Sequence, residues 1–413
     1  MKRFPCEILS NFLSVFSLIL FIGQSHASTN DIATRLKALT GSSRVKVIFT
    51  RDTIAQSDDF PPSNDFYLDQ VLVGFDTDLG KEDTLQSTMA NYQNPLITHN
   101  GARIVYTQFK GDRLDPAHIT MTTYVTAWGK DSVARKVVTG MTACLWYDPA
   151  LNKEYVIYSN QVGGGNVYKR DIDDTLSDTL VLSGKHPITQ WLRISQDGKA
   201  FAGCFGAYEE GASPMKVIRR ADDSEIVYNA GGCWPTMPYD TTKRLVKSTD
   251  NHNSWAVMGT NDDHASESPD KTMIGMFSEL RMASWSPDIF LIVVNALAGQ
   301  NGTGDIKVVK TDASLLHVLD TVTVTPANDW GNCHYADLWA SPLPAATAMK
   351  PWVKTASRFG GNSPTYSREI FTLSGKRVSG ERFVKGFSDL PPGVYISVDR
   401  VNNRIGRVFS ARK

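Results

Sequence analysis

A strand–turn–strand pattern recurs along this chain about every 48 residues. In each unit an apolar run ends at a polar turn residue, and apolar and polar positions then alternate with the period of a half-buried β-strand. The best-formed turns are Asn100-Gly101 and Asp197-Gly198, since Asn-Gly and Asp-Gly supply the positive φ angles of tight hairpins. The turn residues are Asn100, Asp148, Asp197, Asp240 and Asp288. A repeat of this length is typical of propeller blades.

A second hairpin lies between successive turns, which gives each unit four strands. The predicted fold is therefore all-β: a six-bladed β-propeller over residues 28–342. Seven blades remain the alternative if residues 251–277 hold an extra sheet. The segment Arg44–Thr50 reads as the strand after a turn, and Cys333–Trp339 reads as an inner strand with no successor. We expect these two segments to share one blade and close the ring.

Residues 1–27 have the anatomy of a secretory signal peptide. Lys2 and Arg3 precede an apolar run, and Ser25-His26-Ala27 is a small-residue cleavage site. The apolar run is too short for a membrane span, and no other stretch approaches the length that a span needs. We therefore expect export and no membrane span.

Lysine plus arginine and aspartate plus glutamate both number 43, so the formal net charge is zero. This balance gives no basic excess that would indicate a nucleic-acid partner. Four cysteines follow the leader, namely Cys144, Cys204, Cys233 and Cys333. An exported chain permits disulfides among them, and buried free thiols are equally compatible with the pattern.

The pattern changes after Pro342. Residues 343–365 are rich in proline, alanine and glycine and are predicted to form a linker. Residues 366–413 contain their own short β pattern with turn glycines, including Gly375 and Gly393, and are predicted to form a small β-sandwich.

The turn segments resemble those of TolB-type propellers. The matching stretches are Ser195-Gln-Asp-Gly-Lys199, Trp285-Ser-Pro-Asp288 and Pro95-Leu-Ile-Thr-His-Asn-Gly101. The resemblance covers roughly residues 40–342 and implies the fold. It implies little about function, because such propellers include binding scaffolds, peptidase gates and lyases.

The tail resembles the C-terminal sorting domain of type IX secretion cargo. The matching marks are Leu373-Ser-Gly-Lys-Arg-Val378, Leu390-Pro-Pro-Gly-Val-Tyr395 and the basic end Arg407–Lys413. This resemblance implies that the type IX machinery is a partner and that the protein reaches the cell surface or the medium.

Polar loops between strands are the first places to look for a ligand site in a propeller. The richest loop contains His252, Trp255, Asp263 and His264. With His334 these histidines form a candidate set of divalent-metal ligands, although no metal-binding motif is present and no cofactor is required. His334 could also act as a base near the channel.

Aromatic residues near the blade starts, including Trp234, Trp255 and Trp330, offer flat surfaces for a sugar, or else pack between blades. A set of channel histidines would also resemble that of oligogalacturonate lyases, but the likeness stops at the fold. The sequence therefore predicts a secreted or cell-surface propeller that binds a polysaccharide or surface protein without catalysis. The alternative is a metal- or histidine-dependent polysaccharide lyase or hydrolase at the channel mouth.

Overall fold

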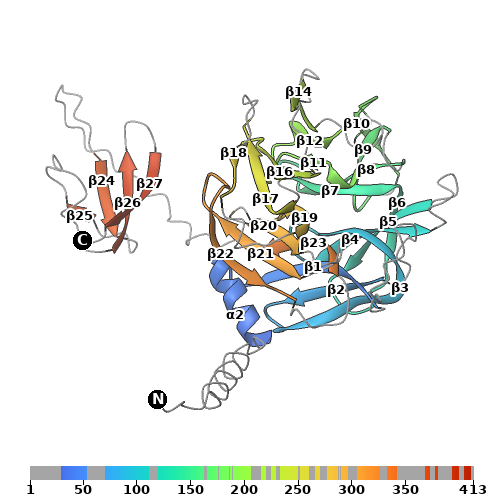
Figure 1. Cartoon of the computed structure of the whole chain (residues 1–413), viewed down its shortest axis with the longest axis horizontal. Helices are drawn as coiled ribbons and strands as arrows, with labels where there is room; N and C mark the ends of the chain where they lie inside the picture. The colour runs from blue at the N-terminus through green and yellow to red at the C-terminus, as the bar shows by residue number, and fades with distance from the viewer. Residues whose placement is uncertain are drawn as a thin grey trace, which may run out of the picture. The chain divides into compact units, whose positions relative to one another are not determined.

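The structure is a computed structural model of the whole chain, and it is an all-β protein with a β-propeller fold (Figure 1). It describes residues 29–53, 70–110, 120–161, 165–174, 176–185, 187, 189–205, 215–219, 225–228, 233–249, 252–259, 266–269, 277–286, 288, 290–295, 305–325, 333–341, 368–372, 377–379, 393–399 and 404–410. The predicted signal peptide and linker lie outside these residues. The chain divides into two compact units, Met1–Thr347 and Ala348–Lys413.

Four sheets of the first unit each contain four consecutive antiparallel strands. Asp148 is the last residue of the first strand of its sheet, and Asp197, Asp240 and Asp288 lie between the first and second strands of theirs, so the turns fall where the repeat predicted them. The strands are β7 (Met141–Asp148), β8 (Lys153–Ser159), β9 (Val167–Asp171), β10 (Thr179–Leu182), β11 (Arg193–Ile194), β12 (Ala200–Cys204), β13 (Met215–Arg219), β14 (Glu225–Tyr228), β15 (Cys233–Thr236), β16 (Leu245–Thr249), β17 (Ser254–Met258), β18 (Ser266–Glu267), β19 (Phe277–Met282), β20 (Phe290–Asn295), β21 (Ile306–Thr311) and β22 (Val318–Thr323).

The remaining strands of this unit form one seven-stranded sheet in the order β23-β1-β2-β3-β4-β5-β6. The first part of β3 pairs with β2, and its last part pairs with β4. The strands are β1 (Val45–Asp52), β2 (Gln70–Asp76), β3 (Lys81–Ile97), β4 (Arg103–Lys110), β5 (Thr120–Ala127), β6 (Arg135–Thr139) and β23 (Cys333–Ala340).

The two ends of the propeller segment pair as expected. Strand β1 runs antiparallel to β23, with Lys46 opposite Trp339 and Thr50 opposite His334. The first strands of the sheets also contact one another in succession. Strand β3 contacts β7, and β7 and β15 both contact the short 3₁₀ helix η2 (Thr189–Trp191) that precedes β11. Strand β15 contacts β19, and β19 contacts β23. Strand β23 contacts β3 again, so the inner strands form a closed ring.

Helix α2 (Thr29–Thr40) was not predicted, because residues 28–342 were read as strands and turns throughout. Its apolar residues Ile32, Ala33, Leu36 and Leu39 are buried at the spacing of one helical face. They join the core cluster that contains β1, β20, β21 and β22. Among the described residues, no helix combines the length and apolar character needed to cross a membrane.

Three cysteine side chains that the structure describes are thiols outside any disulfide. Cys144, Cys204 and Cys333 are buried and unbridged, which favours the thiol alternative for these three. Burial raises the pKa of the Cys144 thiol to about 11, so it stays protonated and behaves as a small apolar side chain.

The described part of the second unit is a four-stranded antiparallel sheet in the order β25-β24-β26-β27. Its strands are β24 (Arg368–Thr372), β25 (Arg377–Ser379), β26 (Gly393–Asp399) and β27 (Arg404–Ser410). These strands fall in the segments that carried the short β pattern. The predicted sandwich stays a prediction, since the described strands make a single sheet.

Candidate functional site

The predicted site residues are only partly covered by the structure. Asp263, His264 and Trp330 lie outside the described residues. Within the described part of the chain, no group of three or more histidine, cysteine, aspartate or glutamate side chains is arranged to hold a metal ion. The proposed metal set therefore stays a prediction for its undescribed members.

His334 is buried between two carboxylates. Its Nε2 lies 3.2 Å from Asp52 Oδ2, and its Nδ1 lies 4.0 Å from Glu279 Oε1. Burial alone would lower the pKa of His334, but the hydrogen bond to Asp52 and the charges of Asp52 and Glu279 more than offset it and raise the pKa. The arrangement ties β23 to β1 and β19, which is a structural role.

The other described candidates also have protein partners. Trp255 is fully buried, and its Nε1 donates a hydrogen bond of 2.6 Å to the Leu315 carbonyl, so this ring has no face for a sugar. Trp234 has a φ of +53° and makes an edge contact with Trp191 at 5.5 Å between ring centroids. His252 is half-buried with a φ of +67°, and burial lowers its pKa.

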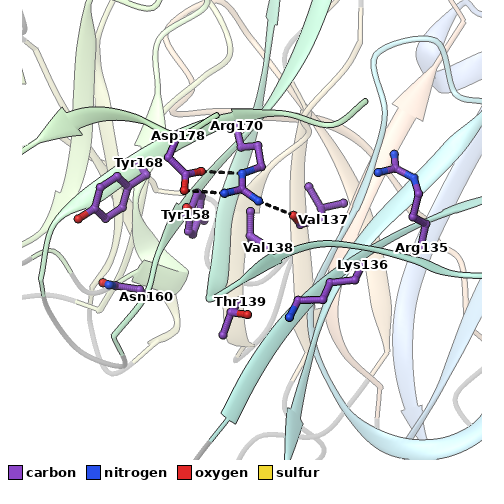
Figure 2. A pocket seen from close by; sticks show the side chains of 10 residues that line it. All are labelled: Arg135, Lys136, Val137, Val138, Thr139, Tyr158, Asn160, Tyr168, Arg170 and Asp178. Carbon is purple, nitrogen blue, oxygen red and sulfur yellow. Dashed lines mark hydrogen bonds and ion pairs between the residues drawn. The ribbon is translucent and has the colours of Figure 1, made fainter. Parts of the chain in front are cut away.

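One cavity of about 800 Å³ lies between strand β6 and the sheet that follows it (Figure 2). Arg170 spans this cavity: its Nη1 donates to the Val137 carbonyl at 2.9 Å, and its Nε and Nη2 donate to the Asp178 carboxylate. These contacts connect β6, β9 and the start of β10. The cavity therefore lies between two neighbouring sheets, and the guanidinium group of Arg170 at its centre is already bound to Asp178 and Val137.

A second cavity, of about 640 Å³, lies at one end of the ring, where the turns between first and second strands meet. We call it the channel mouth. Every inner strand of the ring contributes to its lining through the residues at or just past its end. The lining residues are His99, Tyr147, Pro149, Gln196, Asp197, Tyr239, Thr241, Trp285, Ser286, Trp339 and Ala340.

Aromatic rings dominate the channel mouth. His99 stacks on Tyr147 with 3.8 Å between ring centroids and 3° between ring planes. Trp285 meets His99 edge-on at 5.3 Å and Tyr239 edge-on at 4.4 Å. His99, Tyr147 and Tyr239 are half-buried, and burial lowers the pKa of His99, which therefore stays neutral near pH 7. Such a surface fits the apolar face of a ring-shaped ligand.

Hydrogen bonds to the backbone of His99 hold this aromatic cluster in place. Trp339 Nε1 donates to the His99 carbonyl at 2.8 Å, and the His99 amide donates to Glu154 Oε1 at 2.6 Å. By contrast, Trp285 is 5% exposed, and its Nε1 has no hydrogen-bond partner within the described part of the chain. A buried donor without a partner in a cavity wall is a candidate contact for a ligand acceptor.

Glu154 borders a neighbouring cavity of about 630 Å³ that shares His99 and Tyr147 with the channel mouth. Desolvation raises the pKa of Glu154 to about 7, although the His99 amide and the charge of Arg103 act in the opposite direction. A carboxyl group that titrates near neutral pH beside a cavity marks a candidate site on physical grounds.

The sequence analysis considered the channel mouth but did not identify the residues that line it, although the repeat contained a signal for four of them. In four units the residue just before the turn residue lines the cavity: His99, Tyr147, Gln196 and Tyr239. Three of these four are aromatic. Residues at the same position of successive repeat units converge on the axis of a closed ring. A pattern of metal-ligand residues within one loop does not reveal such a set.

No protein-family model matches the chain, and no curated protein matches it. Solved structures that resemble it include TolB from Acinetobacter baumannii, with 17% sequence identity over 74% of this chain and 70% of that chain and a TM-score of 0.49. The putative TolB from Agrobacterium tumefaciens has 11% identity over 73% of this chain and 100% of that chain, with a TM-score of 0.44. An oligogalacturonate lyase in complex with manganese has 10% identity over 54% of this chain and 68% of that chain, with a TM-score of 0.35. Likenesses this distant carry no argument about activity.

Proposed function

We propose that this chain is an exported six-bladed propeller that binds a polysaccharide, or the glycan of a surface protein, at the channel mouth without covalent chemistry. The observation that carries the proposal is the aromatic cluster of His99, Tyr147, Tyr239 and Trp285 with the unpartnered Trp285 Nε1. Sugar rings present apolar C–H faces to aromatic rings and hydroxyl oxygens to donors, and the cluster supplies both.

Six blades are part of the proposal, and the arrangement of the sheets supports this number. The four sheets of four strands account for four blades, and the seven-stranded sheet accounts for two, because β3 belongs to both. The outer strand of the closing blade thus continues into the inner strand of the next one. With six blades, the end of each inner strand contributes to the channel mouth.

The test is a glycan array probed with the protein lacking its leader, followed by titration of any hit. Tyr147→Ala removes the half-buried ring that stacks on His99, and we expect it to weaken binding about fivefold, since stacking contributes about 1 kcal/mol. The matched control is Tyr168→Ala, which removes a half-buried tyrosine from the cavity of Figure 2. Equal losses in both variants would place the ligand elsewhere.

A catalytic function is the second candidate, and Glu154 is the observation that favours it. A carboxyl group with a pKa of about 7 is poised for proton transfer at neutral pH. A depolymerisation screen on the same glycans distinguishes the two functions. Release of shorter products that Glu154→Gln abolishes would establish a lyase or hydrolase, and binding without product release supports the binding protein.

Delivery to the cell surface is proposed from the leader and the tail. The signal peptide over residues 1–27 provides passage across the inner membrane. The tail, by its resemblance to type IX sorting domains, is proposed to engage that secretion machinery as a partner. The proposed ligand is then a glycan or surface protein outside the cell.

A further inference from the structure

Two arginines extend from inner strands of the propeller into the centre of its ring. Arg281 comes from β19, and Arg193 comes from β11. Asn94, on the inner part of β3, connects them: its Oδ1 accepts a hydrogen bond from Arg281 Nη1. Its Nδ2 donates at 2.8 Å to the Ala143 carbonyl, which also accepts a hydrogen bond of 2.9 Å from Arg193 Nη1. Both guanidinium groups therefore lie beside the same amide.

Arg281 is only 4% exposed, yet much of its hydrogen-bonding capacity is unused. Its Nε and Nη2 have no hydrogen-bond partner among the residues that the structure describes. Glu279 Oε2 lies 3.8 Å from Arg281 Nε, within ion-pair range but too far for a hydrogen bond. The Tyr335 ring lies 5.1 Å from the guanidinium carbon and covers one face of the group.

Arg193 lies in the same polar core of the ring and is half-buried. Desolvation and the nearby positive charge of Arg281 lower the pKa of Arg193 to about 10. Like charges this close inside a protein destabilise each other unless an anion lies between them.

The neighbouring carboxylates are engaged elsewhere. Glu279 accepts the Tyr335 amide hydrogen bond at 2.9 Å and faces His334. Asp337 accepts hydrogen bonds from the amides of Ile97 and Ser284, and burial raises its pKa toward the neutral form. Asp52 pairs with His334. Glu279 is thus the carboxylate that lies within ion-pair distance of Arg281, without a hydrogen bond to it.

We propose that Arg193 and Arg281 form a binding site for a small carboxylate anion in the central channel. A carboxylate accepts two parallel hydrogen bonds from one guanidinium group, and the free Nε and Nη2 of Arg281 form the edge that makes such a bidentate pair. Arg193 adds a second positive charge. This site lies deeper than the channel mouth and is independent of any glycan bound there.

The test uses acetate as the probe and a protein that contains residues 28–413. We expect the melting temperature to rise with sodium acetate and to saturate, because a ligand that binds only the folded state stabilises it. Acetamide has the same shape without the charge, and sodium chloride matches the ionic strength, so neither should produce this rise. Saturation-transfer NMR on the acetate methyl protons should report binding directly, with formate as a competitor.

Variants locate the site. Arg193→Gln should weaken acetate binding at least about tenfold, while Arg135→Gln, which removes an arginine from the outer strand β6, should leave it unchanged. Equal stabilisation by acetate and chloride in the native protein would overturn the proposal even if Arg193→Gln failed to fold. Retained acetate binding in a folded Arg193→Gln protein would overturn it as well. Neither outcome depends on glycan binding, so the proposed function would still stand.

Discussion

Glu154 and His334 are buried ionisable side chains whose pKa values are both raised in the folded protein. Desolvation raises the pKa of Glu154 to about 7 from an ordinary value of 4.5. The pKa of His334 rises above its ordinary value of 6.5 because Asp52 and Glu279 outweigh the effect of burial. In both cases the folded state binds a proton more tightly than the unfolded chain, so each group favours folding less as pH rises.

Glu154 makes the free energy of unfolding fall between about pH 4.5 and pH 7. The Glu154→Gln variant should lack this dependence of the unfolding free energy on pH. The amide oxygen of the glutamine can still accept the hydrogen bond that the His99 amide donates to Glu154. We expect the variant to gain up to about 3 kcal/mol relative to the native protein over this range, given 1.36 kcal/mol for each pKa unit. Urea unfolding at several pH values measures it. An exposed carboxylate variant, Asp320→Asn, should follow the native curve.

His334 contributes stability that is complete below about pH 6.5 and is lost as pH rises through its raised folded pKa. His334→Gln should cost about 3 kcal/mol at pH 6, because it leaves the buried carboxylate of Asp52 without its cationic partner. The difference from the native protein should narrow above the folded pKa. Thermal or urea unfolding from pH 6 to pH 9 checks this, with exposed His317→Gln as control. A deficit that stays constant with pH would contradict the ionic role.

The turn glycines have two separate functions. Gly101 has a φ of +69°, and a Cβ there would lie 2.6 Å from the Trp339 ring of the closing strand. Gly184 has a φ of +63°, but a Cβ there would meet no atom within 4 Å. The pair therefore separates backbone strain from steric conflict.

Gly184→Ala should cost about 1 kcal/mol, the penalty of a left-handed conformation. Gly101→Ala should cost about 3 kcal/mol or more, because the added methyl group must also displace Trp339. Denaturant unfolding of both variants measures the two values. Equal costs would mean that Trp339 moves aside freely, and the contact would then contribute little to ring closure.

Strand and turn positions were predictable because they depend on local sequence. Asn100-Gly101 and Asp197-Gly198 specify hairpins, and alternation specifies which strand faces are buried. Helix α2 was missed for the opposite reason: its apolar face gains much of its stability by packing on β22, which is distant in sequence, in addition to its contacts with the neighbouring strand β1.

The candidate site was less predictable than the fold. The sequence analysis selected residues whose side chains often bind ligands, such as His334 and Trp255. In the structure, His334 lies between the carboxylates of Asp52 and Glu279, and Trp255 is fully buried. The aromatic cluster combines residues from separate units, His99 to Trp285, whose convergence requires the ring to be closed in a definite register. Composition of any single segment could not reveal it.

At the level of the whole molecule, the N-terminal segment and the second unit should differ in how much they stabilise the first unit. Deleting residues 28–50 removes helix α2 and most of β1, and it leaves β23 without its partner. We expect the entire ring to lose stability in one cooperative transition, rather than one end to fray. Calorimetry on the truncated protein measures this, and an unchanged melting temperature would refute closure by a shared sheet.

Removing the second unit should have the opposite effect. A protein that ends at Thr347 keeps every strand of the first unit, so its melting temperature should stay within about 2 °C of the full chain. If the tail is a sorting domain, the truncated protein should remain in the periplasm of a type IX-competent host. Cell fractionation reports this, and secretion of the truncated protein would exclude the sorting role.

The pairing of β1 with β23 also determines when the protein can finish folding. Thr50 and His334, which are hydrogen-bonded across this pair, are 284 residues apart in the chain. Joining segments that distant costs about 5 kcal/mol of loop entropy, and it gives the fold a high contact order. A chain emerging from a ribosome or a translocation pore must therefore persist as an open arc with an unpaired edge until its last inner strand is released. That open arc, with its unpaired strand edge, is the form most exposed to aggregation.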